Sequence, residues 1–194
     1  MSQADIRPWS AAAIEARYRG QRDPWHFATS DYEQERYRTT LRSLQRQRYG
    51  ACFEPGCSVG ELTALLAARC SSVFATDVAP TAVAAARRRC AGMTNVEIAC
   101  APLSPQLRLH GFDLIVFSEI GYYFSARALA RIARQVRRWL AAQGEFIAVH
   151  WLGHSADHRL HADEVHRILT EHLALQWAHG EVHPGYRIDS WIAA

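Results

Sequence analysis

The sequence predicts an α/β protein built on a doubly wound, Rossmann-like sheet that is mostly parallel, with one antiparallel strand from a C-terminal hairpin. Between Ala51 and Val149, short apolar runs alternate with amphipathic stretches of helical length. Strands separated by helices in this way pair in parallel through right-handed crossovers. Beyond His150 two strand-like runs follow, joined by a Pro-Gly turn signal. With 194 residues, 49% of them hydrophobic, the chain has enough apolar surface for one domain of ordinary size.

Two helices and an aromatic loop are expected before the sheet. The first helix covers about Ser10–Arg19. The second begins at Ser30, because Ser30–Glu33 has the S-x-x-E form of a capping box, in which a hydroxyl and a carboxylate satisfy free amides reciprocally. It runs towards Gln47, and the aromatic loop Asp23–Phe27 precedes it.

The alternating region and the C-terminal region then divide as follows. Strands are expected at Ala51–Glu54, Ser72–Thr76, Val96–Cys100, Phe112–Ser118 and Gly144–Val149, with helices at Glu61–Arg69, Thr81–Cys90 and Ala126–Leu140 between them. The C-terminal helix is expected at Asp163–His172, and the hairpin strands at Leu175–Glu181 and Tyr186–Ile192.

Composition excludes several classes of function. All 22 basic residues are arginines, which rules out a Schiff base on a protein lysine, and they are scattered among 19 acids rather than gathered for nucleic acid. Five cysteines without a C-x-x-C pair favour a reducing cytoplasm over a disulfide framework or a thiolate zinc site. Met1–Trp9 is polar and contains Pro8, unlike a signal peptide, and no apolar stretch approaches a membrane span. We therefore expect a cytoplasmic protein without nucleic-acid or membrane partners.

The loop after the first strand carries an acid and two glycines. A dinucleotide site would read G-x-G-x-x-G against a pyrophosphate, whereas this loop has only Gly56 and Gly60 and begins with Glu54. A carboxylate is badly placed against pyrophosphate but suits a cationic ligand. An NAD-dependent oxidoreductase is therefore disfavoured.

A second acid, Asp77, ends the second strand 21 residues after Gly56. In doubly wound folds an acid at this position accepts hydrogen bonds from both ribose hydroxyls. Together with Glu54, it describes an adenosine ligand that carries positive charge and no phosphate. S-adenosylmethionine has these properties.

These motifs resemble those of a known class. Glu54-x-Gly56-x-x-x-Gly60 followed by Asp77 resembles the cofactor loop of class I S-adenosylmethionine-dependent methyltransferases, and Phe112–Phe124 resembles their fourth-strand motif. More narrowly, Asp23-Pro24-Trp25 ahead of Tyr32–Tyr37 resembles the nodulation protein S group of N-methyltransferases. In that group the acceptor is the free amine of a de-N-acetylated glucosamine unit on a chitin-like oligosaccharide. The resemblance implies a helical lid segment over residues 1–48 and a methyltransferase domain over residues 49–194.

The sequence departs from the class pattern at two places. Ser58 stands where the middle glycine is usual. After the third strand, Ala101 and its neighbours offer no acid to the adenine amino group. Adenine is therefore expected to be held by backbone groups and apolar packing, with Val78 on its other side.

Three residues are candidates for the acceptor side. Glu119 follows the fourth strand and could orient or deprotonate an attacking amine, or else cap a helix or form a salt bridge. Tyr122 could line the acceptor cleft or simply pack. His150 ends the fifth strand and could act as an acceptor-side base or hydrogen-bond partner. Trp25 could close over the cofactor or anchor the N-terminal arm.

No metal site is expected. His154, His158 and His161 have helical spacing, but the segment has little apolar support for a helix and no evident acidic partner.

We predict an S-adenosylmethionine-dependent methyltransferase that moves a methyl group by in-line displacement to a small-molecule acceptor. By resemblance, that acceptor is an amine on an amino sugar or similar molecule. An O-methyltransferase of a phenolic or hydroxylated metabolite and a nucleotide-binding module without catalysis are the alternatives. The predicted cofactor contacts are Trp25, Glu54, Gly56, Cys57, Ser58, Gly60, Asp77, Val78, Ala101 and Ser118.

Overall fold

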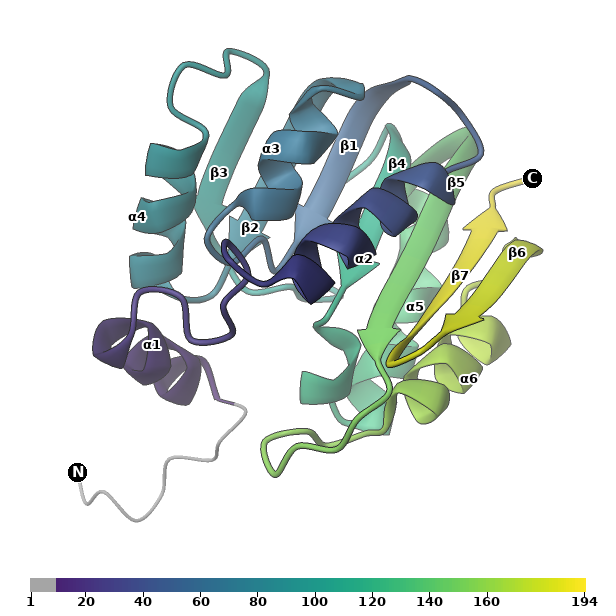
Figure 1. Ribbon diagram of the computed structural model, residues 1–194. Helices are drawn as coiled ribbons and strands as arrows, with labels where there is room; N and C mark the ends of the chain where they lie inside the picture. Colours follow the sequence, from purple (N-terminus) through teal and green to yellow (C-terminus); the bar gives the residue numbers. More distant parts are fainter. Residues whose placement is uncertain (1–9) are drawn as a thin grey trace.

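A computed structural model describes residues 10–194, so the prediction for Met1–Trp9 lies outside the described residues. In chain order the strands are β1 (Tyr49–Pro55), β2 (Cys70–Asp77), β3 (Val96–Cys100), β4 (Phe112–Ser118), β5 (Leu140–Trp151), β6 (Gln176–His183) and β7 (Tyr186–Ile192). They form one described sheet in the order β3-β2-β1-β4-β5-β7-β6 (Figure 1).

Helices cover both faces of this sheet (Figure 1). They are α1 (Ala11–Gly20), α2 (Asp31–Arg42), α3 (Glu61–Ala67), α4 (Pro80–Arg89), α5 (Ala126–Trp139) and α6 (Ala162–His172), with a short 3-10 turn, η2 (Gly121–Tyr123), after β4. The helices α2, α3 and α4 lie on one face, and α5 and α6 lie on the other.

The predicted fold class is confirmed. Strands β1 to β5 pair in parallel, and β7 pairs antiparallel with both β5 and β6. The hairpin turns at Pro184 and Gly185, where Gly185 adopts a φ of +94° that favours glycine. The one antiparallel strand of the described sheet is therefore β7, held between β5 and β6.

Strand alternation sends side chains into two separate cores. In β4, Leu114 and Val116 pack on the α2–α4 side, while Ile115 and Phe117 pack on the α5–α6 side. All four are at most 1% exposed. Both faces of a mostly parallel sheet are covered, which explains the continuous apolar run of this strand.

The second helix starts at Ser30 as predicted, but its C-terminal end and its capping box differ from the prediction. It ends at Arg42 rather than near Gln47. At its start Ser30 accepts a hydrogen bond from the Glu33 amide at 3.4 Å, but the Glu33 carboxylate turns to Arg36 instead of back to Ser30. Only half of the predicted capping box forms, because a buried guanidinium competes for the carboxylate.

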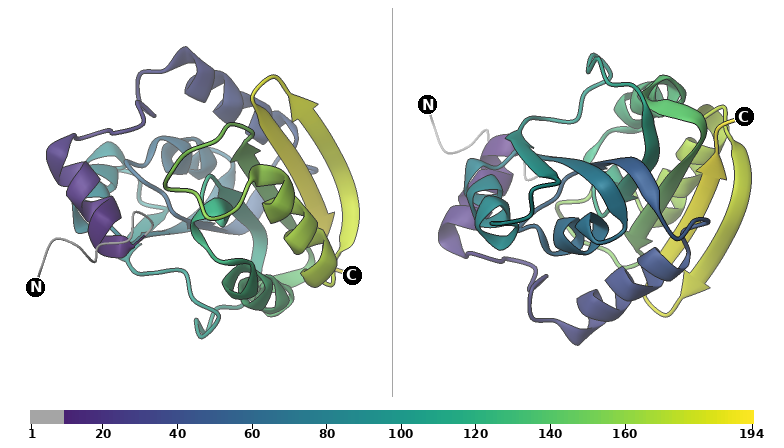
Figure 2. Two further views of the ribbon diagram at one scale, coloured as in Figure 1. Left: turned by 90° about the horizontal axis from the view of Figure 1, so that it is seen from below. Right: turned by 90° about the horizontal axis from the view of Figure 1, so that it is seen from above.

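The first helix lies beside the carboxyl ends of the strands (Figure 2, left). Its Glu15 accepts hydrogen bonds from the Thr81 amide (3.0 Å) and hydroxyl (2.7 Å) at the start of α4. A carboxylate at a helix N-terminus satisfies free amides and complements the helix dipole. This contact fixes α1 against the N-terminus of α4.

Over residues 10–194, none of the helices has the length and hydropathy that crossing a membrane requires.

We expect Gly60→Ala to be more destabilising than Gly92→Ala. Both glycines have a positive φ, +88° and +87°, which costs an alanine about 1–2 kcal/mol. A Cβ at Gly60 would also lie 2.9 Å from the Ala86 Cα of α4, whereas a Cβ at Gly92 meets nothing within 4 Å. Close packing adds roughly 1–3 kcal/mol to the Gly60 variant alone.

Denaturant unfolding of the two variants measures this difference. Equal losses in the free energy of unfolding would show that α4 does not press on the backbone of Gly60.

Candidate active site at the carboxyl ends of the strands

A cavity of about 610 Å³ opens at the carboxyl ends of β1, β2 and β4. This volume is in the range of small-molecule sites, and the position is the one at which doubly wound folds bind ligands. Its walls also include α1, the start of α2, and the loop between β5 and α6, whose place is visible in Figure 2 (left). Of the residues predicted for the site, nine line it: Trp25, Gly56, Ser58, Asp77, Val78, Ala101, Ser118, Glu119 and Tyr122.

The loop between β1 and α3 has a backbone that favours glycine. Gly56 has a φ of +78°, and a Cβ there would lie 2.3 Å from Cγ2 of Ile120. Ser58 also has a positive φ, +50°, and its hydroxyl is hydrogen-bonded to the hydroxyl of Tyr18 on α1. The serine that replaces the usual glycine thus ties the loop to the N-terminal helix.

Asp77 ends β2 at the wall of the cavity. Its Oδ2 accepts from the Ser58 amide and its Oδ1 from the Ala79 amide, both at 2.9 Å. Burial raises the pKa of this carboxyl, and the backbone hydrogen bonds oppose the shift. The carboxylate is therefore held in a fixed orientation by the backbone on both sides.

Beyond Asp77 the cavity wall is apolar. Ile14 of α1, Val78, Ala101 and Leu103 line this end. A flat base without charge fits such a wall, in agreement with the lack of an acid after β3.

Three predicted cofactor contacts are not at this cavity. Glu54 and Cys57 border a separate void of about 30 Å³ behind the loop, and Gly60 packs on α4. Glu54 accepts a hydrogen bond from Thr63 Oγ1 at 2.6 Å, and burial raises its pKa to about 7. It shares the strand face of Cys52, which α3 covers, and this explains its distance from the larger cavity.

Glu119 is held by three donors at the far side of the cavity. Its Oε1 accepts from the Trp151 amide and its Oε2 from the Tyr122 hydroxyl, each at 2.7 Å. Arg36 Nη1 lies 2.8 Å from Oε2. The residue adopts a φ of +60°, a sparsely populated conformation for glutamate that is often found at functional sites.

Two residues of α2 that sequence reasoning did not assign to the site reach the same place. Glu33 lines the cavity. Arg36 lies between Glu33 and Glu119, and the Arg36 side chain is 1% exposed. The two acids raise the pKa of Arg36 above its ordinary range in spite of its burial. The signal was present as Tyr32–Tyr37, which the family resemblance singled out without a role for its charges.

Aromatic rings complete the lining of the cavity. Tyr122 stacks on His158 with ring centroids 3.7 Å apart and an angle of 14°. Trp25 stacks on Phe27 and meets Tyr18 edge to face. His154 and His158 line the cavity, but over residues 10–194 no three metal-ligating side chains cluster.

His150 does not reach the cavity, so its predicted role as an acceptor-side base is not supported. It is fully buried, and its Nε2 accepts from the Gly121 amide at 3.0 Å. The neutral ring therefore carries its proton on Nδ1, which lies 3.1 Å from Nε2 of His166. His166 in turn donates from Nδ1 to Asp189 at 2.6 Å. This chain of hydrogen bonds fixes η2, and with it Tyr122, from behind.

The architecture matches solved structures closely. A protein of Pseudomonas syringae assigned to the methyltransferases is 36% identical, with a TM-score of 0.72 over 83% of this chain and 98% of that one. The N-methyltransferase NodS of Bradyrhizobium japonicum WM9, in complex with S-adenosyl-L-homocysteine, is 24% identical, with a TM-score of 0.83 over 94% of this chain and 98% of that one. The fold is that of the class I S-adenosylmethionine-dependent methyltransferases.

The sequence profile of the family described as nodulation protein S (NodS) matches residues 13–175. The chain belongs to this family. Nodulation protein S of Bradyrhizobium diazoefficiens is 34% identical over 102 residues, or 52% of this chain and 49% of that protein. The Sinorhizobium fredii protein is 34% identical over 112 residues, or 57% and 52%. The chain spans about half the length of the curated relatives it matches.

We expect His150→Gln to flatten the pH dependence of stability. Burial holds the pKa of His150 well below its ordinary 6.5. Below that pH, His150 is therefore protonated in the unfolded chain but stays neutral in the folded chain. The free energy of unfolding therefore falls as pH drops below about 6.5, by up to ~1.4 kcal/mol per pH unit for this group. Glutamine keeps an acceptor for the Gly121 amide but does not titrate.

Urea unfolding between pH 7 and pH 5 compares the two slopes, whatever the stability of the variant at pH 7. An unchanged slope would show that His150 takes up a proton in the folded protein.

Proposed function

We propose that this chain transfers a methyl group from S-adenosylmethionine to the amine of a small molecule, an amino sugar or oligosaccharide. The observation that carries the proposal is the charge distribution along one cavity. Asp77 lines it from the end of β2, and Glu119 lines it from the end of β4, on the other side of β1, together with Glu33, which shares Arg36 with Glu119. Among the described residues, no arginine lines this cavity. Such a site favours a phosphate-free, cationic pair of ligands.

The nucleoside end fits adenosine. A carboxylate held like that of Asp77 can accept hydrogen bonds from the two ribose hydroxyls. Val78, Ala101 and Leu103 offer apolar contact to the base. The lack of basic side chains distinguishes this end from a site for a nucleotide phosphate, in agreement with the complexes of relatives with S-adenosyl-L-homocysteine.

The amino-acid end of the cofactor fits the region around Gly56, Ser58 and Ser118. The small void beside them is bordered by Glu54 and by Arg36. Arg36 Nε is buried and has no hydrogen-bond partner among the described residues. A carboxylate would satisfy this donor, and Glu54 would face the ammonium group across the loop.

Bound S-adenosylmethionine supplies an electrophilic methyl group on a sulfonium. Trp25 and Phe27 line the cavity and would exclude water from it, while Glu33, Glu119 and Tyr122, which also line it, would align the acceptor with the methyl carbon. In-line displacement needs little covalent help, so most of the rate comes from alignment and desolvation.

The acceptor side favours an amine over a phenol. Glu33 and Glu119 carry two negative charges against the one positive charge of Arg36, and a substrate ammonium would balance the remainder. Tyr32, Trp151 and His158 provide flat faces, which suit a sugar ring or a cation. A structural relative, NodS of Bradyrhizobium japonicum, is an N-methyltransferase, which agrees with this choice.

Replacing Asp77 by Asn tests the cofactor site. We expect the affinity for S-adenosyl-L-homocysteine to fall at least tenfold, because a charged hydrogen bond contributes about 1.5–3 kcal/mol. Glu97→Gln, an exposed change on β3, should leave the affinity unchanged. Titration calorimetry measures both, with NAD as a second ligand that should not bind. An unaltered affinity in the Asp77 variant would place the ribose elsewhere.

A methyl-transfer screen with isotopically labelled cofactor tests the acceptor class. We expect labelled product with glucosamine and its β-1,4-linked oligosaccharides, read by mass, and none with phenols or thiols. Methylation of phenols but not of amines would contradict the proposal in favour of the O-methyltransferase. Cofactor binding without transfer to any acceptor would favour the non-catalytic module.

A further inference from the structure

Of the two acids on the proposed acceptor side, Glu33 accepts fewer hydrogen bonds from this chain and can therefore bind a substrate. Glu119 already accepts from three donors of this chain, the Trp151 amide at Oε1 and both Tyr122 and Arg36 at Oε2. Glu33 Oε2 accepts a hydrogen bond from Arg36, and Oε1 has no hydrogen-bond partner among the described residues. Its side chain is 11% exposed, and the residue lines the cavity.

Arg36 fixes the position of this carboxylate. Its guanidinium is buried between Glu33 and Glu119, and it makes ring contacts with Tyr32 and Tyr37 at just under 6 Å. With both acids ionised, the three side chains carry one net negative charge in a largely water-free place. Such a charge attracts a cation strongly and can be neutralised by one proton.

We propose that Glu33 binds the substrate ammonium group and accepts its proton before methyl transfer. This inference rests on the proposed function. An ammonium nitrogen has no lone pair, so transfer needs the neutral amine. Glu119 and Arg36 then remain as a neutral ion pair that holds the site in shape.

Proton transfer to Glu33 precedes the transfer of the methyl group. One N–H bond of the ammonium breaks, its electron pair stays on nitrogen, and the proton joins a Glu33 oxygen. The nitrogen lone pair then forms the bond to the methyl carbon, while the carbon–sulfur electron pair goes to sulfur. The methylated ammonium product leaves with its charge, and Glu33 returns its proton to solvent.

The surroundings of Glu33 suit proton exchange near neutrality. Burial is the main cause that raises its pKa, to about 7, with Arg36 of α2 acting in the opposite direction. Glu119 after β4 and Asp23 of the aromatic loop raise it further. A general base is most effective when its pKa lies near the working pH.

The test compares Glu33→Gln with the wild type in methyl transfer to the β-1,4-linked glucosamine tetrasaccharide. At pH 7 we expect kcat/KM to fall about 10²–10⁴-fold, the usual effect of losing a general base. The wild-type profile should be bell-shaped, between the pKa of Glu33 and that of the amine. The variant should rise through the pKa of the amine without falling, so that the deficit shrinks at least tenfold by pH 9.

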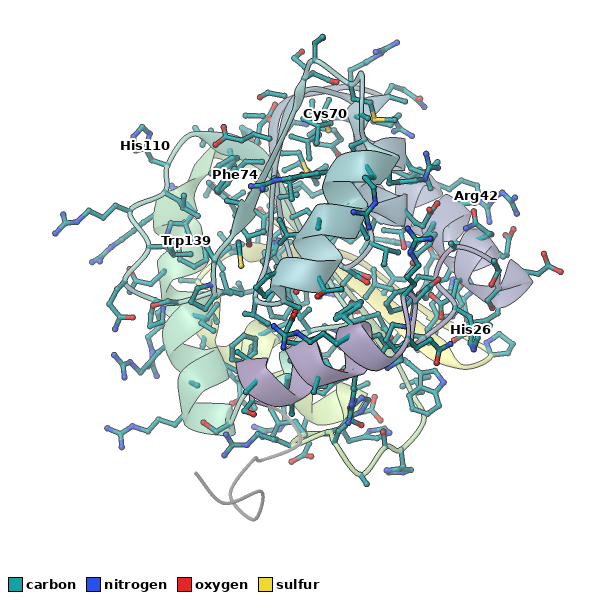
Figure 3. The ribbon with its side chains drawn as sticks, turned by 90° about the vertical axis from the view of Figure 1, so that its left-hand side faces the viewer. His26, Arg42, Cys70, Phe74, His110 and Trp139 are labelled. Atoms are coloured by element: carbon teal, nitrogen blue, oxygen red, sulfur yellow. The ribbon has the colours of Figure 1, made fainter. Side chains whose placement is uncertain are left out.

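Two further variants serve as controls. Glu35→Gln lies on the outer face of α2, where Glu35 pairs with Arg38 and Arg42, the latter visible in Figure 3, and should behave as wild type. Glu33→Asp keeps a charge for Arg36 and should retain the bell shape at reduced rate. Calorimetry with S-adenosyl-L-homocysteine should give all variants an affinity within about threefold of wild type, which shows that they are folded.

The outcomes separate the inference from the function on which it rests. A wild type that transfers methyl to the tetrasaccharide, with a Glu33→Gln deficit that is small or constant across pH, would overturn the inference alone. A wild type that binds S-adenosyl-L-homocysteine but methylates no amine would overturn the proposed function and the inference together.

Discussion

The buried ion pairs of Arg36 are the constraint on which the proposed acceptor side of the cavity depends. A guanidinium inside a protein requires compensating charge, and removing one partner of such a pair costs several kcal/mol. Glu33 and Glu119 supply that charge from two distant parts of the chain, α2 and the end of β4. Helix α2 is thereby joined to the end of β4 at the cavity. The positions of both acids, which line the cavity, are therefore set by their ion pairs with one arginine.

The ends of β4 and β5 support this arrangement from behind. Glu119 accepts from the Trp151 amide, and His150 accepts from the Gly121 amide, so each strand end holds the other in register. The positive φ of Glu119 turns its side chain towards Arg36 and Tyr122. Backbone strain at this residue is stabilised by three hydrogen-bonding or charged partners. His150 accepts the hydrogen bond from the Gly121 amide only in its neutral form, because a protonated Nε2 has no lone pair.

The fold could be predicted because the hydrophobic periodicity of the sequence identifies its strands and helices. Several site residues could not, because their positions depend on ion pairs and hydrogen bonds that leave no periodic pattern. Strands β3, β4 and β7 have the predicted bounds, and Asp77 lies at the cavity as its place at a strand end implies. Alternation explains why two predicted residues do not line the larger cavity, because Glu54 shares the face of Cys52 under α3, and His150 shares the face of Phe146 under α6. Arg36 and Glu33 could not be placed, since a charged residue in a polar helix gives no sign of burial. The capping-box pattern at Ser30 pointed Glu33 to the wrong partner.

The measurement that tests this account most directly is a crystal structure with S-adenosyl-L-homocysteine and an amino-sugar acceptor bound together. The account predicts the ribose hydroxyls against the Asp77 carboxylate, and the acceptor nitrogen within hydrogen-bond distance, about 2.7–3.2 Å, of a Glu33 oxygen. A nucleoside bound away from Asp77 would contradict the account at its centre. So would an acceptor whose nitrogen faces neither Glu33 nor the sulfur atom.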